Sequence, residues 1–65
     1  MIPKVGDKIK WRFDTDKKDH YNMVTNVELC EDDPYVFSTY WHIWLDNEEC
    51  IRPNNVIEII KPVNN

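Results

Sequence analysis

The chain has 65 residues and a formal net charge of −4 at pH 7, a length that limits it to one small domain. It contains no alanine, the best helix former, but three Trp, three Tyr and two Phe, so the composition argues against an all-α fold and supplies large side chains for a core. No apolar run approaches the roughly 20 residues of a membrane span, and the first residues lack the apolar core of a signal peptide, which together predict a cytoplasmic protein without a membrane contact.

The expected organisation is a single domain over residues 1–65, with 1–4 and 61–65 as terminal segments. The bias towards Lys, Asn and Ile is what an AT-rich genome gives. Together with a start at Met1, it favours a free-standing accessory protein, such as one encoded by a phage.

The first predicted strand covers residues 8–13, where apolar and basic side chains alternate. Before it, Gly6 is the expected positive-φ position of a turn. After it, residues 14–20 form a polar loop, which lacks the glycine and the bidentate glutamate of a calcium loop.

Residues 21–30 and 35–45 predict two longer strands, separated by an acidic turn at 31–34. The composition favours pairing of odd residues with odd residues, but a four-residue turn would pair odd with even. An odd-length loop or a β-bulge would reconcile the two, and a bulge near Thr25 and Asn26 is the preferred explanation.

A two-residue turn at Asp46 and Asn47 is expected to lead into the fourth strand. That register would direct Cys50 into the core and Ile51 to the outer face. A tight 3-10 turn at 52–55 and a last strand at 56–60 complete the chain. The predicted core contains the apolar residues of the inward faces: Ile9, Trp11, Phe13, Val27, Leu29, Phe37, Trp41, Ile43, Leu45, Ile57 and Ile59.

Two short motifs resemble small β-barrels of the SH3-like class. Residues 5–9 are similar to the hydrophobic-Gly-Asp-x-hydrophobic entry of Tudor, KOW and SH3 barrels, and residues 51–57 are similar to the Pro-x-Asn-x-Val turn before the last SH3 strand, one residue shorter. The resemblance implies an all-β fold, a five-stranded SH3-like barrel with a single 3-10 turn before the last strand. The Ala-Leu-Tyr-Asp-Tyr opening of peptide-binding SH3 domains is absent.

A Tudor-like reading implies an aromatic cage for a methylated amine. Phe13, Tyr21, Tyr40 and Trp44 are its candidate walls, and Asp46 or Glu48 its acidic floor.

Catalytic and metal chemistry are not expected. No serine has a nucleophile-elbow setting, and the carboxylate pairs lie in turns, so the chain is predicted not to be an enzyme. The order His20, Cys30, His42, Cys50 has no zinc-knuckle spacing. The hairpin prediction also separates the two cysteines by roughly 20 Å, so neither a metal, a cofactor nor a disulfide is expected.

The favoured function is therefore a non-catalytic protein-binding module. Tyrosine and tryptophan inside a polar rim are typical interface anchors. The candidate partner-binding residues share the outer face of the third strand and its exit: Tyr40, His42, Trp44, Ile51, Glu48 and Glu49. Two alternatives leave this face unused by a partner protein: a homodimer formed through it, or coverage by the chain's own termini.

The second candidate function is nucleic-acid association of the KOW type. Its evidence is a basic stripe on the first strand and the adjoining loop, with one tyrosine for base stacking: Lys8, Lys10, Arg12, Lys17, Lys18 and Tyr21. The opposing explanation is that lysines protect an edge strand from pairing with another chain.

Overall fold

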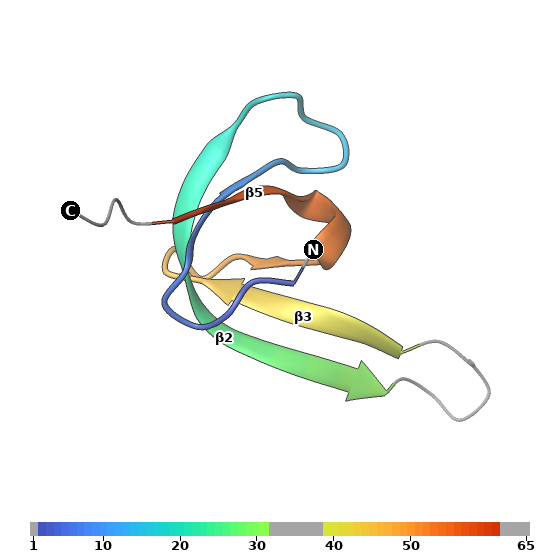
Figure 1. Cartoon of the computed structure of the whole chain (residues 1–65). Helices are drawn as coiled ribbons and strands as arrows, with labels where there is room; N and C mark the ends of the chain where they lie inside the picture. The colour runs from blue at the N-terminus through green and yellow to red at the C-terminus, as the bar shows by residue number, and fades with distance from the viewer. Residues whose placement is uncertain (1, 32–38, 62–65) are drawn as a thin grey trace.

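A computed structural model describes residues 2–31 and 39–61, which form one antiparallel sheet (Figure 1). Its strands are β1 (Lys8–Trp11), β2 (His20–Glu31), β3 (Thr39–Leu45), β4 (Cys50–Ile51) and β5 (Val56–Ile60), and a 3-10 helix, η1 (Pro53–Asn55), precedes β5. The strand order is β4-β3-β2-β1-β5, so β4 and β5 are the edges and the sheet is not closed. The described residues contain no α-helix, and none of their helices is long and apolar enough to cross a membrane. The all-β prediction is confirmed.

β2 is the strand shared by the two halves of the sheet. Its first residues pair with β1, from Trp11↔His20 to Lys8↔Met23, and the rest pairs with β3. The register shifts between Val24 and Asn26, which leaves Thr25 as an extra residue, and β2 curves strongly along its length (Figure 1). The predicted position of the bulge and the odd-with-odd pairing beyond it are therefore confirmed. The bulge does not produce that pairing, however, because Glu31 already pairs with Thr39 across seven intervening residues, an odd number, and not across the predicted four-residue turn.

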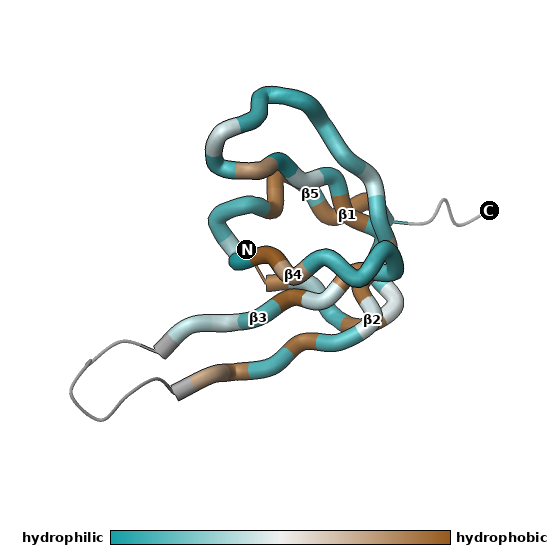
Figure 2. Tube along the Cα trace, turned by 180° about the vertical axis from the view of Figure 1, so that it is seen from behind, coloured by the Kyte–Doolittle hydropathy of each residue, from teal (hydrophilic) through white to brown (hydrophobic). Residues whose placement is uncertain are grey.

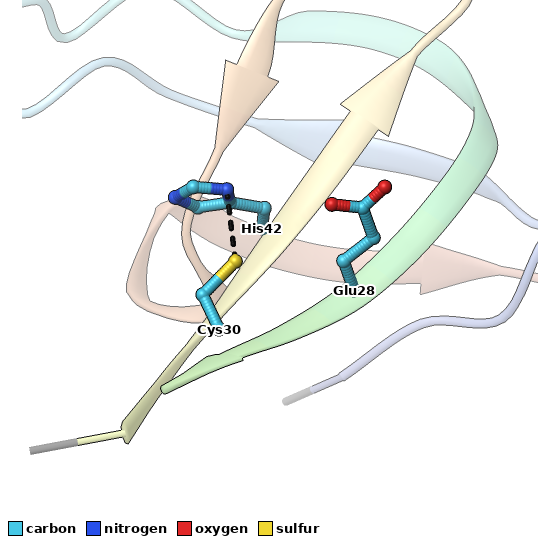
Figure 3. Close-up of side chains that lie close together, drawn as sticks. All are labelled: Glu28, Cys30 and His42. Carbon is cyan, nitrogen blue, oxygen red and sulfur yellow. Dashed lines mark hydrogen bonds between the residues drawn. The ribbon is translucent and has the colours of Figure 1, made fainter. Parts of the chain in front are cut away.

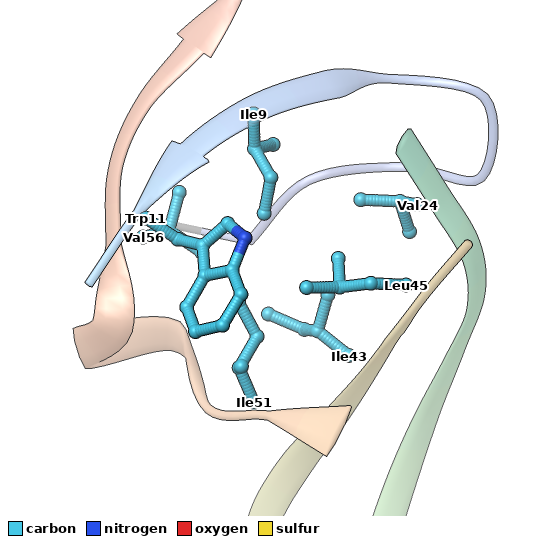
Figure 4. Packing of buried hydrophobic residues seen from close by; sticks show 7 residues of the cluster. All are labelled: Ile9, Trp11, Val24, Ile43, Leu45, Ile51 and Val56. Atoms are coloured by element: carbon cyan, nitrogen blue, oxygen red, sulfur yellow. The ribbon is translucent and has the colours of Figure 1, made fainter. Parts of the chain in front are cut away.

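The core gathers where β1, β3, β4 and β5 face the bend of β2 (Figure 4). Its seven buried residues come from all five strands: Ile9, Trp11, Val24, Ile43, Leu45, Ile51 and Val56. Four of these were predicted, namely Ile9, Trp11, Ile43 and Leu45. The predicted Val27 and Ile59 are partly buried and pack against the cluster, and Trp41 is half-buried.

Three other predicted core residues are exposed, and in each case the path or register of the backbone explains the exposure. Phe13, 39% exposed, follows the end of β1 at Trp11. Leu29, 50% exposed, lies where β2 and β3 extend beyond the other strands. Ile57, 41% exposed, is the extra residue where the β1–β5 register shifts, so that Val56 faces the core instead. Glu31, the first residue of the predicted acidic turn, is instead the last residue of β2 and pairs with Thr39. The rest of that turn, Phe37 and the start of the predicted third strand lie outside the described residues.

The turn between β3 and β4 is one residue longer than predicted. Leu45 accepts a hydrogen bond from the Glu48 N–H (3.0 Å) and donates its own N–H to the Glu49 carbonyl (2.9 Å), while Glu48 has a φ of 69°. This is a three-residue loop whose last residue is left-handed. The added residue shifts the register to Ile43↔Ile51 and Trp44↔Cys50. The predictions of an inward Cys50 and an outward Ile51 are therefore wrong: Ile51 is buried and Cys50 is exposed.

The remaining turns agree with the sequence. Gly6 has the expected positive φ of 93°, and its N–H donates to the Val24 carbonyl at 2.8 Å. The 3-10 turn and the bounds of β5 are confirmed. Asn55 fixes η1 to the end of β1, because its side-chain amide donates to the Arg12 carbonyl (2.9 Å) and to Asp14 Oδ1 (2.8 Å). The connection between β1 and β2 is hydrophilic, as predicted (Figure 2).

Candidate functional site

Beyond the bulge, even-numbered side chains of β2 share one surface of the sheet with those of β3; this surface is here called the outer face. The register places Cys30 opposite Tyr40, Glu28 opposite His42 and Asn26 opposite Trp44, and Cys50 of β4 flanks Trp44 on the other side. Since directly paired residues point to the same side of a sheet, these side chains lie together. The outer face therefore comprises Asn26, Glu28, Cys30, Tyr40, His42, Trp44 and Cys50.

Three half-buried rings run along β3 on this face. The ring centroids of Tyr40 and His42 are 4.9 Å apart, and those of His42 and Trp44 are 6.4 Å apart with their planes at 85°. At one end, the Arg52 guanidinium carbon lies 4.4 Å from the Tyr40 ring centroid, a cation–π contact. Tyr40, His42 and Trp44 were predicted to lie on one face, and the structure brings them together.

Beside these rings, Glu28, Cys30 and His42 converge (Figure 3). Cys30 Sγ lies 3.2 Å from His42 Nδ1, and one ligand atom from each of the three side chains lies within 4.8 Å of the others. Asn26 Nδ2 donates a hydrogen bond to Glu28 Oε1 at 2.9 Å, which orients the carboxylate. Cys30 and His42 are half-buried, whereas Glu28 is exposed.

The second thiol, Cys50, flanks the same face from β4. Partial burial is the main cause of a raised pKa of Cys50; Cys30 and Glu28 also raise it and Arg52 opposes them, so on balance the thiol form is favoured. The predicted separation of the cysteines assumed that Cys30 lies opposite residue 35 and Cys50 opposite Ile43. In the structure they lie opposite Tyr40 and Trp44, diagonally on either side of His42.

An open hollow of about 600 Å³ adjoins Trp44 at the other end of the outer face. The bulge of β2 and the left-handed end of the β3–β4 turn both contribute to its wall. Its lining residues are Thr25, Asn26, Glu28, Trp44, Leu45 and Glu48. An aromatic wall with two exposed carboxylates is suited to a cationic group. Glu49 is also exposed, next to this turn, but it does not line the hollow.

Acidic side chains lie among the residues of the predicted basic stripe. Arg12 Nε hydrogen-bonds to Asp19 Oδ1, and Lys10 Nζ lies 3.8 Å from Asp19 Oδ2. The hydrogen bond from Arg12 lowers the pKa of the Asp19 carboxyl, and the same contact raises the pKa of Arg12. Glu58 of β5 lies opposite Lys10 as well. Two bases of the stripe are thus paired with or next to carboxylates.

The other members of the stripe are spread around this region. Lys8, Lys17 and Lys18 are exposed, and Tyr21, 54% exposed, lies opposite Lys10. The explanation that lysines protect an edge strand is wrong, because β1 lies between β2 and β5.

The aromatic residues of the predicted cage belong to two groups. Phe13 packs against Trp11 (centroids 4.6 Å apart) and His20 (5.2 Å). Tyr40 and Trp44 instead flank His42 on the outer face. The ring contacts of the described residues therefore do not join Phe13 to Trp44 in one box.

Sequence reasoning missed the contributions of Glu28 and Cys30 to this surface. The signal was present, because odd-with-odd pairing of β2 and β3 also implies even-with-even pairing, which places both residues beside His42. Comparison with known proteins found no matching family model, no matching curated protein and no matching solved structure.

Proposed function

We propose that this protein is a non-catalytic docking module with an SH3-like fold, which binds an extended protein segment carrying a lysine or arginine side chain. The observation that carries the proposal is the hollow beside Trp44, between Glu28 and Glu48. The SH3-like assignment is supported by the five-strand order, the shared and bent β2, and the single 3-10 turn before β5.

A basic side chain fits this hollow for two reasons. The indole face of Trp44 attracts a cation by about 0.5–1 kcal/mol at an exposed position, and the two carboxylates supply the opposite charge. The outer face already shows the same chemistry within the chain, where the Arg52 guanidinium covers the Tyr40 ring at 4.4 Å.

A protein segment is a better ligand for this surface than a nucleic acid. The hollow is acidic, and the net charge of −4 opposes a phosphate backbone. The basic stripe is the alternative site, but Asp19 pairs with both Lys10 and Arg12 and offsets part of their charge. Of the predicted partner-binding residues, Tyr40, His42, Trp44 and Glu48 remain in the proposed surface, Glu49 borders it, and the buried Ile51 does not belong to it.

The test is a titration followed by the backbone and indole N–H signals in NMR spectra. The probes are a short β-forming peptide whose only charged side chain is one central arginine, the same peptide with citrulline in its place, and a single-stranded oligonucleotide. We expect the arginine peptide to shift the Trp44 indole signal and the amides around Thr25 and Glu48, and the citrulline peptide to bind several-fold more weakly.

Matched variants locate the binding surface. Trp44→Ala and Glu48→Gln should remove most of the binding of the arginine peptide, whereas Lys8→Ala should leave it unchanged. Equal binding of arginine and citrulline peptides would contradict the proposal. Shifts at Lys8 and Tyr21 with the oligonucleotide alone would replace it with the basic stripe, and concentration-dependent shifts of the Trp44 indole without any ligand would replace it with a homodimer.

A further inference from the structure

The convergence of Glu28, Cys30 and His42 on the outer face unites three kinds of metal donor. A thiolate, an imidazole nitrogen and a carboxylate oxygen are the donors that zinc takes in proteins. Thiolate and imidazole together select zinc over magnesium or calcium, which prefer oxygen ligands. Glu28 and Cys30 are two residues apart on β2, and His42 lies on the neighbouring strand opposite Glu28. The set is therefore held by paired backbone rather than by a loop.

The separations suit a tetrahedral ion. With Zn–S near 2.3 Å and Zn–N near 2.0–2.1 Å, sulfur and nitrogen of two tetrahedral ligands lie roughly 3.5 Å apart. Cys30 Sγ and His42 Nδ1 are 3.2 Å apart, and the carboxylate of Glu28 completes a set within 4.8 Å. Around an ion, the sulfur–nitrogen separation would widen slightly and the carboxylate would move closer to both atoms.

Neighbouring side chains position two of the donors. Asn26 holds the Glu28 carboxylate by the 2.9 Å hydrogen bond to Oε1, and the rings of Tyr40 and Trp44 flank the imidazole of His42. Such supporting contacts orient ligands in metal sites and tune their affinity.

We propose that Glu28, Cys30 and His42 form a binding site for one zinc ion. On binding, Cys30 releases its thiol proton to solvent and the sulfur–imidazole contact is replaced by two bonds to the ion. A water molecule completes the tetrahedron. The ion cross-links β2 to β3, so it stabilises the folded chain by binding to it and not to the unfolded chain.

The zinc site shares Glu28 with the proposed docking hollow but is tested without a peptide. The reduced protein is titrated with Co²⁺ alone, whose tetrahedral thiolate complexes absorb in the near ultraviolet and the visible, and then with Zn²⁺. We expect one equivalent of Co²⁺ to give a thiolate-to-cobalt band, Zn²⁺ to abolish that band, and Zn²⁺ to raise the midpoint of thermal unfolding.

Variants assign the ligands. Cys30→Ser should abolish the thiolate band and weaken Zn²⁺ binding by about 100-fold or more, and His42→Asn should weaken it similarly. Cys50→Ser is the matched control, because it removes the other thiol that flanks His42 and should leave band and affinity unchanged. Circular dichroism verifies that each variant is folded.

Two results would overturn the proposal. One is the absence of a thiolate band and of any Zn²⁺-dependent rise in the unfolding midpoint of the folded, reduced wild type. The other is a band that survives Cys30→Ser and disappears with Cys50→Ser. Because neither readout involves a peptide, failure here leaves the docking proposal intact, and failure of peptide binding leaves the zinc proposal intact.

Discussion

The two ends of β2, before and after the bulge at Thr25, differ in what their polar groups do. Before the bulge, Asn22 Oδ1 accepts the Trp11 indole N–H at 2.9 Å, and Asn22 Nδ2 donates to Asp46 at 2.8 Å. These polar groups pair with one another around the core. After the bulge, Glu28 and Cys30 meet His42 beside an open hollow.

The extra residue at Thr25 explains this difference. It changes which side of the sheet the even residues of β2 face, so Val24 is buried whereas Glu28 and Cys30 lie on the outer face. One strand can therefore stabilise the fold with its first part and carry ligand-binding groups on its second part.

Trp11→Ala should have the largest effect on stability. Trp11 is 1% exposed and its indole also hydrogen-bonds to Asn22, so the loss is about 3–5 kcal/mol, enough to unfold a domain of this size at room temperature. Urea unfolding followed by circular dichroism measures it. The matched substitution Trp44→Ala, on the outer face, should cost much less and leave the chain folded. Equal losses for the two would contradict the division between core and outer face.

The two parts of β2 can be compared directly through the loss of stability caused by Val24→Ala and by Leu29→Ala. Val24 is 1% exposed and Leu29 is 50% exposed. We expect about 2 kcal/mol of destabilisation for Val24→Ala and under about 1 kcal/mol for Leu29→Ala, although leucine loses more atoms. The midpoints of urea unfolding decide the order. A larger loss at Leu29 would mean that the core extends along the β2–β3 hairpin.

Much of this fold could be predicted because its signals are local. The first strand was predicted from the alternation around Ile9 and Trp11, and the last strand from the apolar run of β5. Pro53 indicated the 3-10 turn. The bulge at Thr25 was predicted from a conflict between a four-residue turn and the hydrophobic pattern; its position was right, but the register shows no such conflict, because seven residues separate the paired Glu31 and Thr39. Register errors account for the main mistakes.

The register errors have physical causes. Glutamate is a poor residue for a left-handed φ, so Glu48 gave no sign of the third turn residue, and Cys50 and Ile51 were assigned to the wrong faces. Likewise, nothing local marks Ile57 as an extra residue of β5. The meeting of Cys30 with His42 is a contact between strands, which motif spacing along the chain cannot show.

Glu48→Gly should raise stability slightly. Glu48 has a φ of 69°, a conformation that costs an L-residue about 1 kcal/mol and that glycine adopts without strain. Glycine also loses more backbone entropy on folding than glutamate does, which offsets part of this benefit. We therefore expect the free energy of unfolding to rise by roughly 0.5 kcal/mol. The same change removes a carboxylate from the hollow, so binding of the arginine peptide should weaken.

Thermal unfolding and the peptide titration measure the two effects of this change. Glu49→Gly is the control, because Glu49 lacks a positive φ and lies outside the hollow, so it should bring no gain in stability and no loss of binding. A destabilised Glu48→Gly variant would show that the glutamate side chain stabilises the turn by more than its backbone strain costs.

Asp19→Asn should have the smallest effect, a slight loss of stability at neutral pH that disappears in acid. The hydrogen bond from Arg12 keeps the pKa of Asp19 below its ordinary value, so the folded chain holds this carboxylate ionised more readily than the unfolded chain does. Its stabilising contribution is therefore present above the unfolded pKa of about 4 and is lost as the pH falls through the lower folded pKa. Asp19→Asn should make the fall in unfolding midpoint below about pH 4 shallower, and about 1 M salt should reduce the difference from wild type. Superimposable pH curves for the two proteins would mean that Asp19 does not pair with Arg12 and Lys10 in solution, which would return the basic stripe to consideration as a nucleic-acid site.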